Sequence, residues 1–280
     1  MSSAQILILG ALAGGTILIG LPVGRLTSPS IRMKAALSAV ATGILLFLLY
    51  DVIHGSIEPV DEALEGAVDG GSWGHFAWYT ILFGVGFLVG LMSLVYYDGW
   101  MKRRRNKAML GPGAASAAEF EPSWAASLSA SAWLSLLIAT GIGLHNFSEG
   151  LAIGQAGAAD EISLAVVLII GFGLHNATEG FGIVAPLSGE PVRPSWRFLL
   201  LLGLIGGGPT FAGTLIGQTW VSESLSILFL SLAAGSILFV VLELVNVNRR
   251  MASKELIAWF LLLGLFLGFA TEFVVEAAGV

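Results

Sequence analysis

The stretch Gly141-Ile-Gly-Leu-His-Asn-Phe-Ser-Glu-Gly150 returns thirty residues later as Gly171-Phe-Gly-Leu-His-Asn-Ala-Thr-Glu-Gly180, with seven of the ten positions identical. Each copy lies near the middle of an apolar run that is long enough to cross a bilayer. Consecutive spanning helices run in opposite directions, so the two copies predict an inverted repeat. Many transporters use such repeats to build a site near the bilayer midplane.

The composition around the repeat is that of a membrane protein. Apolar residues make up 56% of the 280-residue chain, charged residues only 11%, and the mean hydropathy is +0.86. These values exclude an ordinary water-soluble domain, and a net charge of -6 argues against a nucleic-acid partner. The chain has no cysteine, so any metal must be held by nitrogen and oxygen atoms.

Apolar stretches of about 20 residues, the length that spans the hydrocarbon core, recur along the whole sequence. They predict an all-α, polytopic membrane protein with a single domain over residues 1–280 and with the inverted repeat in its fourth and fifth helices. The eight expected helices cover residues 4–24, 33–54, 76–97, 128–156, 160–187, 196–219, 224–246 and 255–278.

Lysine and arginine set the expected orientation. All thirteen fall in alternate connections, which follow the helices ending near residues 24, 97, 187 and 246. With basic connections on the cytoplasmic side, both termini and the acidic loop 58–69 face the extracellular or periplasmic side of a plasma or inner membrane. The basic run 102–105 is read as a topology anchor, with a lipid-headgroup patch as the alternative.

Histidine and glutamate recur four residues apart in both copies, and residues at that spacing share one helix face. An ionisable group at membrane depth is costly unless it faces a cavity, a partner or an ion. Imidazole with carboxylate suits Zn²⁺, Fe²⁺, Mn²⁺, Co²⁺ and Ni²⁺. The alternative is that the histidine and glutamate of each pair only hydrogen-bond to each other and hold two helices together. The expected metal ligands are His145, Asn146, Glu149, His175, Asn176 and Glu179.

Other polar groups lie nearer the expected membrane surfaces. Asp51 and His54, at the outer end of the helix over 33–54, are assigned to an entrance, although the acidic loop that follows could equally be a solvated surface. Asp98 and Glu243 lie toward the cytoplasmic side and are assigned to an exit. Pairing of Glu243 with Arg249 or Arg250 is the alternative.

The two motifs His145-Asn-Phe-Ser-Glu-Gly150-Leu-Ala-Ile-Gly154 and His175-Asn-Ala-Thr-Glu-Gly180 resemble the paired motifs of the ZIP (zinc/iron-regulated transporter-like) family. Weaker similarity covers Ala41-Thr-Gly-Ile-Leu-Leu-Phe-Leu-Leu-Tyr-Asp51 and Leu232-Ala-Ala-Gly-Ser-Ile-Leu-Phe-Val-Val-Leu-Glu243. The resemblance implies uptake of a divalent transition metal toward the cytoplasm, with Zn²⁺ first and Cd²⁺, Fe²⁺ or Mn²⁺ as further substrates. It also implies a binuclear site with these six ligands, a homodimer in membrane lipid, and metal as substrate rather than cofactor.

The chain departs from the family pattern in two ways. Ser148 and Thr178 stand where the family often has proline, and the connection 102–123 lacks the histidines that are common there. The expected helix over 196–219 offers only Gly207, Gly208, Pro209 and Thr210 near the site, so no strong ligand is expected from it. The run of three glycines before Pro209 should break or thin that helix.

An intramembrane metal-dependent hydrolase is the alternative function, because a metal with a nearby glutamate can also activate water. Zinc proteases of the common type need His-Glu-x-x-His on one helix, and that motif is absent. A structural or receptor-like protein would leave the repeated intramembrane pairs unexplained. The sequence therefore favours a transporter that is not an enzyme.

Overall fold

The structure is a computed structural model that describes residues 2–26, 31–108, 128–158, 162–190, 192–219 and 222–277. Every regular element in these ranges is helical, which confirms the expected all-α class. The elements are α1 (Ser3–Gly15), α2 (Ile17–Gly20), η1 (Leu21–Arg25), α3 (Ile31–Val68), α4 (Trp73–Ala108), α6 (Ala130–Ala158), α7 (Ile162–Val184), η3 (Ala185–Gly189), α8 (Trp196–Gly217), α9 (Glu223–Met251) and α10 (Lys254–Ala277).

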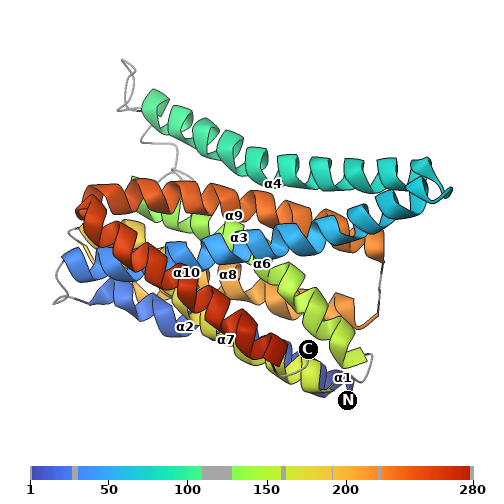
Figure 1. Cartoon of the computed structure of the whole chain (residues 1–280). Helices are drawn as coiled ribbons and strands as arrows, with labels where there is room; N and C mark the ends of the chain where they lie inside the picture. The colour runs from blue at the N-terminus through green and yellow to red at the C-terminus, as the bar shows by residue number, and fades with distance from the viewer. Residues whose placement is uncertain are drawn as a thin grey trace.

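Helices long enough to cross a membrane dominate the molecule. Within the described residues, seven stretches have the length and apolar composition of a span, and α7, with 23 residues, takes the place of the remaining expected one. The long helices run alongside one another, and α1 begins and α10 ends at the same end of the bundle as the α3–α4 turn (Figure 1). The polytopic fold is therefore confirmed.

Two helices extend well beyond their expected ends. The 38-residue α3 continues through Pro59 to Val68, so most of the expected acidic loop is helical. The 36-residue α4 continues through Lys102 into the basic run, while the rest of that connection, 109–127, lies outside the described residues. Hydropathy marks only where a helix leaves the hydrocarbon, and glutamate, alanine and lysine continue a helix readily in water. The turn after α3 uses Gly70, whose φ is +98°.

The expected helix over 4–24 is divided, whereas the expected break in the helix over 196–219 is absent. Thr16 separates α1 from α2, and its Oγ1 donates to the carbonyl of Ala13 at 2.7 Å. In contrast, α8 runs unbroken through Pro209. Two of the glycines before that proline, Gly206 and Gly207, allow neighbouring helices to approach closely and so fill a packing role.

Close helix contacts hold the centre of the bundle around α8. A Cβ on Gly150 of α6 would overlap the backbone of Thr210, and a Cβ on Gly207 would overlap the carbonyl of Gly14 in α1. Only glycine permits such approach. Large apolar side chains, among them Ile138, fill the remaining space. The helices α1, α6, α7 and α8 are thus packed closely where the repeat lies.

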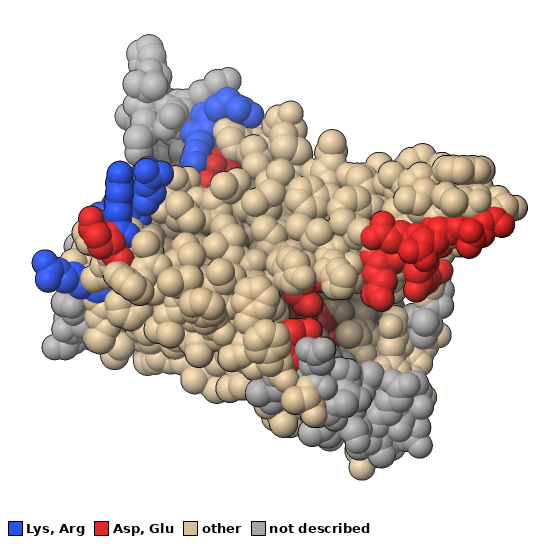
Figure 2. Space-filling view, in the orientation of Figure 1, with Lys and Arg blue, Asp and Glu red and all other residues tan. Residues whose placement is uncertain are grey.

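Charge is divided between the two ends of the molecule. Lysine and arginine gather at the end where α9 finishes and α10 begins, and acidic residues gather at the opposite end, over the α3–α4 turn (Figure 2). Further acidic side chains lie in a hollow in the middle of the same face (Figure 2). The two ends therefore differ in charge as the alternating distribution of lysine and arginine in the sequence predicts.

Candidate metal centre

The two copies of the repeat face each other across α6 and α7. His145, Asn146 and Glu149 lie on α6, and His175, Asn176 and Glu179 lie on α7. All six are buried, with at most 8% of any residue exposed. The imidazole ring centroids of His145 and His175 are 6.2 Å apart. The fold therefore places the six predicted residues in one buried cluster.

Glu149 joins the two histidines. Its Oε1 lies 2.8 Å from Nε2 of His145, one turn away on the same helix, and 2.5 Å from Nε2 of His175 on the facing helix. One ligand atom from each of these three residues lies within 4.8 Å of the others. Two imidazoles and a carboxylate at this spacing form a donor set that suits a borderline divalent ion.

The second carboxylate has a different environment. Nδ2 of Asn146 lies 3.5 Å from Oε2 of Glu179, and Nδ2 of Asn176 lies 3.5 Å from Oε2 of Glu149. This crosswise pairing is what two antiparallel copies of one motif produce. Glu149 nevertheless meets both imidazoles, whereas the recorded partner of Glu179 is an amide. The two halves of the repeat are therefore chemically unequal.

Each asparagine is anchored by a backbone carbonyl of a third helix. Asn146 donates to Gly206 of α8 at 2.9 Å, and Asn176 donates to Ala13 of α1 at 3.2 Å. Because the amide nitrogens are occupied in this way, the amide oxygens are left for another partner. Neither carbonyl could be predicted from the sequence, since a backbone acceptor leaves no residue signature.

Several buried oxygen atoms at the cluster have no protein partner. They are Oδ1 of Asn146, Oδ1 of Asn176, Oε1 of Glu179 and Oγ1 of Thr210 in α8. Buried polar atoms are nearly always hydrogen-bonded, so a group of unpartnered acceptors marks a place where water or a cation can bind. Thr210 is the only side-chain oxygen in this group that α8 supplies, in line with the expected lack of a strong ligand there.

The hydroxyl groups that replace the family's prolines do not join the cluster. Ser148 donates to the carbonyl of Phe229 in α9 at 3.3 Å, and Thr178 donates to the carbonyl of His175 at 2.7 Å. Both α6 and α7 continue past these residues. The hydroxyls therefore bond to backbone, as threonine and serine often do inside helices.

The two residues assigned to the entrance occupy different positions. Asp51 on α3 is partly buried and lies within electrostatic range of His145 and His175. His54 is exposed, and its ring stacks on Tyr50 with centroids 6.2 Å apart. Asp51 is thus close enough to act on an ion at the cluster, while His54 lies at the surface.

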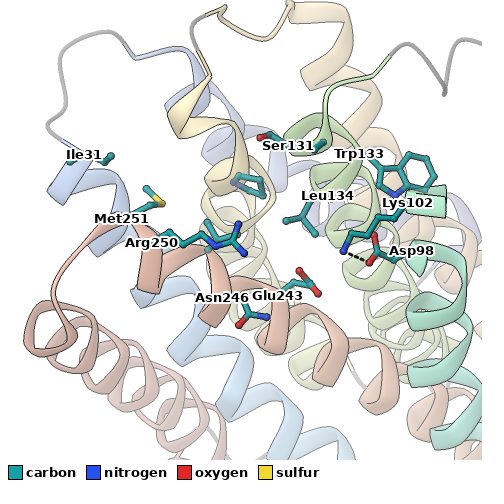
Figure 3. A pocket seen from close by; sticks show the side chains of 13 residues that line it. Ile31, Asp98, Lys102, Ser131, Trp133, Leu134, Glu243, Asn246, Arg250 and Met251 are labelled. Atoms are coloured by element: carbon teal, nitrogen blue, oxygen red, sulfur yellow. Dashed lines mark ion pairs between the residues drawn. The ribbon is translucent and has the colours of Figure 1, made fainter. Parts of the chain in front are cut away.

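The two residues assigned to the exit share a separate pocket of about 500 Å³ with Lys102, Asn246 and Arg250. Asp98 and Lys102 reach into it from α4, and Glu243 and Asn246 from α9 (Figure 3). Nζ of Lys102 lies 2.5 Å from Oδ2 of Asp98. The structure therefore brings Asp98 and Glu243 together, with cations beside them.

Comparison with known proteins identifies the family. The sequence model described as ZIP zinc transporter matches residues 102–276, more than half of the chain, including both motifs and the segment 232–243 but not the segment 41–51. None of the curated proteins that were compared matches the chain. Members of this family are transporters, which excludes the hydrolase alternative. The chain belongs to the ZIP zinc transporter family.

Proposed function

We propose that this multi-pass membrane protein carries Zn²⁺ toward the cytoplasm through the centre that α6 and α7 form. The observation that carries the proposal is the set of ligand atoms from His145, Glu149 and His175, all within 4.8 Å of one another and all buried. Three ionisable groups in a spanning region are costly without an ion or partner. A transported divalent cation accounts for all three at once.

The donor atoms indicate the metals that the centre accepts. Imidazole nitrogen and carboxylate oxygen suit Zn²⁺, and they also accept Cd²⁺, Fe²⁺ and Mn²⁺. The chain has no sulfur ligand from cysteine to favour Cu⁺. Zn²⁺ is therefore the first substrate to test, with the other three as competitors.

Asn146, Asn176 and Glu179 complete the proposed ligand set. Both amide oxygens and Oε1 of Glu179 are buried without a protein partner, and both amide nitrogens already have backbone acceptors. These oxygen ligands, added to the three-residue cluster, would let the centre bind a second ion or let the first ion move between ligands.

The proposed route runs from the acidic end to the basic end. Asp51 would guide the ion from the entrance to the two histidines, with His54 exposed nearer the outside, and Asp98 with Glu243 would receive it. With the basic end in the cytoplasm, both termini face the outside of a plasma or inner membrane. A homodimer, which the family resemblance implies, stays a prediction.

Zinc uptake into liposomes tests the proposal. The purified protein is reconstituted around a fluorescent zinc indicator, and the initial rate is compared with that of the His145→Ala, His175→Ala double variant. We expect uptake by the parent chain and loss of at least about 90% of the rate in the double variant, because even the loss of a residue that only supports a metal ligand commonly costs about tenfold in affinity or activity.

Ser148→Ala is the matched control, because Ser148 lies on the same turn but bonds to α9. It should keep most of the uptake rate. Parent-like uptake by a folded double variant would refute the role of the two histidines. An equal loss of the uptake rate in the control and in the double variant would mean that misfolding causes the loss.

A further inference from the structure

The pocket between α4 and α9 contains charged groups that the central site does not use. Two carboxylates, Asp98 and Glu243, share it with Lys102 and Arg250, and Asn246 adds an amide. Asp98 is the most enclosed of the charged groups, with 7% of its surface exposed. Among the described residues, two negative and two positive side chains line the pocket, so their charges balance.

Asp98 has one oxygen paired and one free. Oδ2 lies 2.5 Å from Nζ of Lys102, while Oδ1 is buried and has no hydrogen-bond partner among the residues that the structure describes. A buried carboxylate oxygen without a partner is rare, and this carboxylate borders an open cavity beside Glu243 (Figure 3). The geometry is that of a cation site in which a lysine ammonium already holds one ligand.

Lys102 is suited to leave that position. Its side chain is 56% exposed and lies four residues after Asp98 on the same helix, so its end can swing into water without moving backbone. An ammonium on a flexible stem makes a single-point contact, unlike the two-point contact of a guanidinium. Because the ammonium end of the pair is exposed to water, it can give up its place beside Asp98 to a divalent ion.

We propose that Lys102 is a tethered counter-cation that keeps the metal affinity of the Asp98–Glu243 pocket low. The ammonium competes with an arriving divalent ion for Asp98, so the pocket passes ions on instead of retaining them. This inference rests on the proposed function, in which the pocket lies on the exit route.

Metal binding by variants that lack the central site tests this role. The ligands here are carboxylate and amide oxygens, which suit Mn²⁺, and free Mn²⁺ is measured directly by electron paramagnetic resonance. In the His145→Ala, His175→Ala background, Lys102→Met should tighten Mn²⁺ binding by about tenfold or more, because a positive charge close to the ion is removed. Adding Asp98→Asn should abolish the gain.

Two controls separate the local effect from overall charge and from the background variants. Lys102→Arg keeps the charge and should show no gain. Arg103→Met removes a neighbouring charge that does not line the pocket, and it should also show no gain. Lys102→Met is also measured in the otherwise unaltered chain, where it should add one bound Mn²⁺ per chain. This measurement does not depend on correct folding of the double variant.

The proposal is overturned if Lys102→Met binds Mn²⁺ no more tightly than its background, or if Arg103→Met gains as much. Both results are independent of transport, because the measurement needs no flux and no central site. Failure of zinc uptake by the parent chain would refute the proposed function, while a Lys102→Met gain would still establish the pocket as a cation site.

Discussion

Replacing Glu149 with glutamine removes the charge from the one carboxylate that lies beside both imidazoles of the centre. Its Oε1 is 2.8 Å from His145 and 2.5 Å from His175, and the residue is 4% exposed. Glutamine has nearly the same shape, so the packing of α6 is kept. The change therefore tests charge and ligation and leaves volume unaltered.

The size of the effect follows from this position. A charge-assisted contact to a buried group is worth about 1.5–3 kcal/mol, which corresponds to a rise in the metal dissociation constant of roughly 10- to 150-fold. Glu179→Gln should raise the dissociation constant by less than about tenfold, because the hydrogen-bond partner of Glu179 is an amide at 3.5 Å. The structure alone predicts which of the two variants loses more affinity, since the two sequence motifs are alike.

Titration calorimetry with Zn²⁺ in detergent micelles measures both dissociation constants. Ser148→Ala serves as the matched control on α6, and circular dichroism checks that each variant is helical. A Glu149→Gln variant that binds zinc as tightly as the parent chain would refute this account of the centre. A larger loss in Glu179→Gln than in Glu149→Gln would transfer the main ligand role to α7.

Two further properties are expected of the folded protein. Gly207→Ala should destabilise it by about 1–3 kcal/mol, because the new methyl group overlaps the carbonyl of Gly14. The control, Gly208→Ala, places its methyl group in open space and should leave the melting temperature unchanged or slightly raised. A size-exclusion thermal melt measures both variants. Zinc affinity should fall by about tenfold or more between about pH 7.5 and about pH 5.5, because protons compete for imidazole nitrogen, and constant affinity in calorimetry would exclude histidine ligation.

Much of the architecture could be predicted because a membrane span depends on length and composition, which a sequence states directly. The repeat at 141–150 and 171–180 also predicted that its histidines and glutamates would face one another. The helical extensions over 55–68 and 98–108 were missed because hydropathy is insensitive to helix outside the hydrocarbon. The division of the first helix at Thr16 was also missed, because hydropathy does not register a local change in helix geometry.

The inequality of the two motifs could not be predicted. It depends on the offset between α6 and α7, which brings Glu149 to both histidines while Glu179 meets Asn146, and a repeat of sequence does not specify that offset. The carbonyls of Ala13 and Gly206 carry no residue signal either. The pair of Asp98 and Lys102, in contrast, has the spacing of a helical ion pair and could have been found.

X-ray absorption spectroscopy of the zinc-loaded protein tests the central claim most directly, because it reports the atoms that touch the ion. The account predicts a first shell of nitrogen and oxygen at roughly 2.0–2.2 Å, with the outer-shell scattering of imidazole, and loss of that imidazole signal in the His145→Ala, His175→Ala variant. An all-oxygen shell without imidazole scattering, unchanged in the double variant, would contradict the assignment of the centre to α6 and α7.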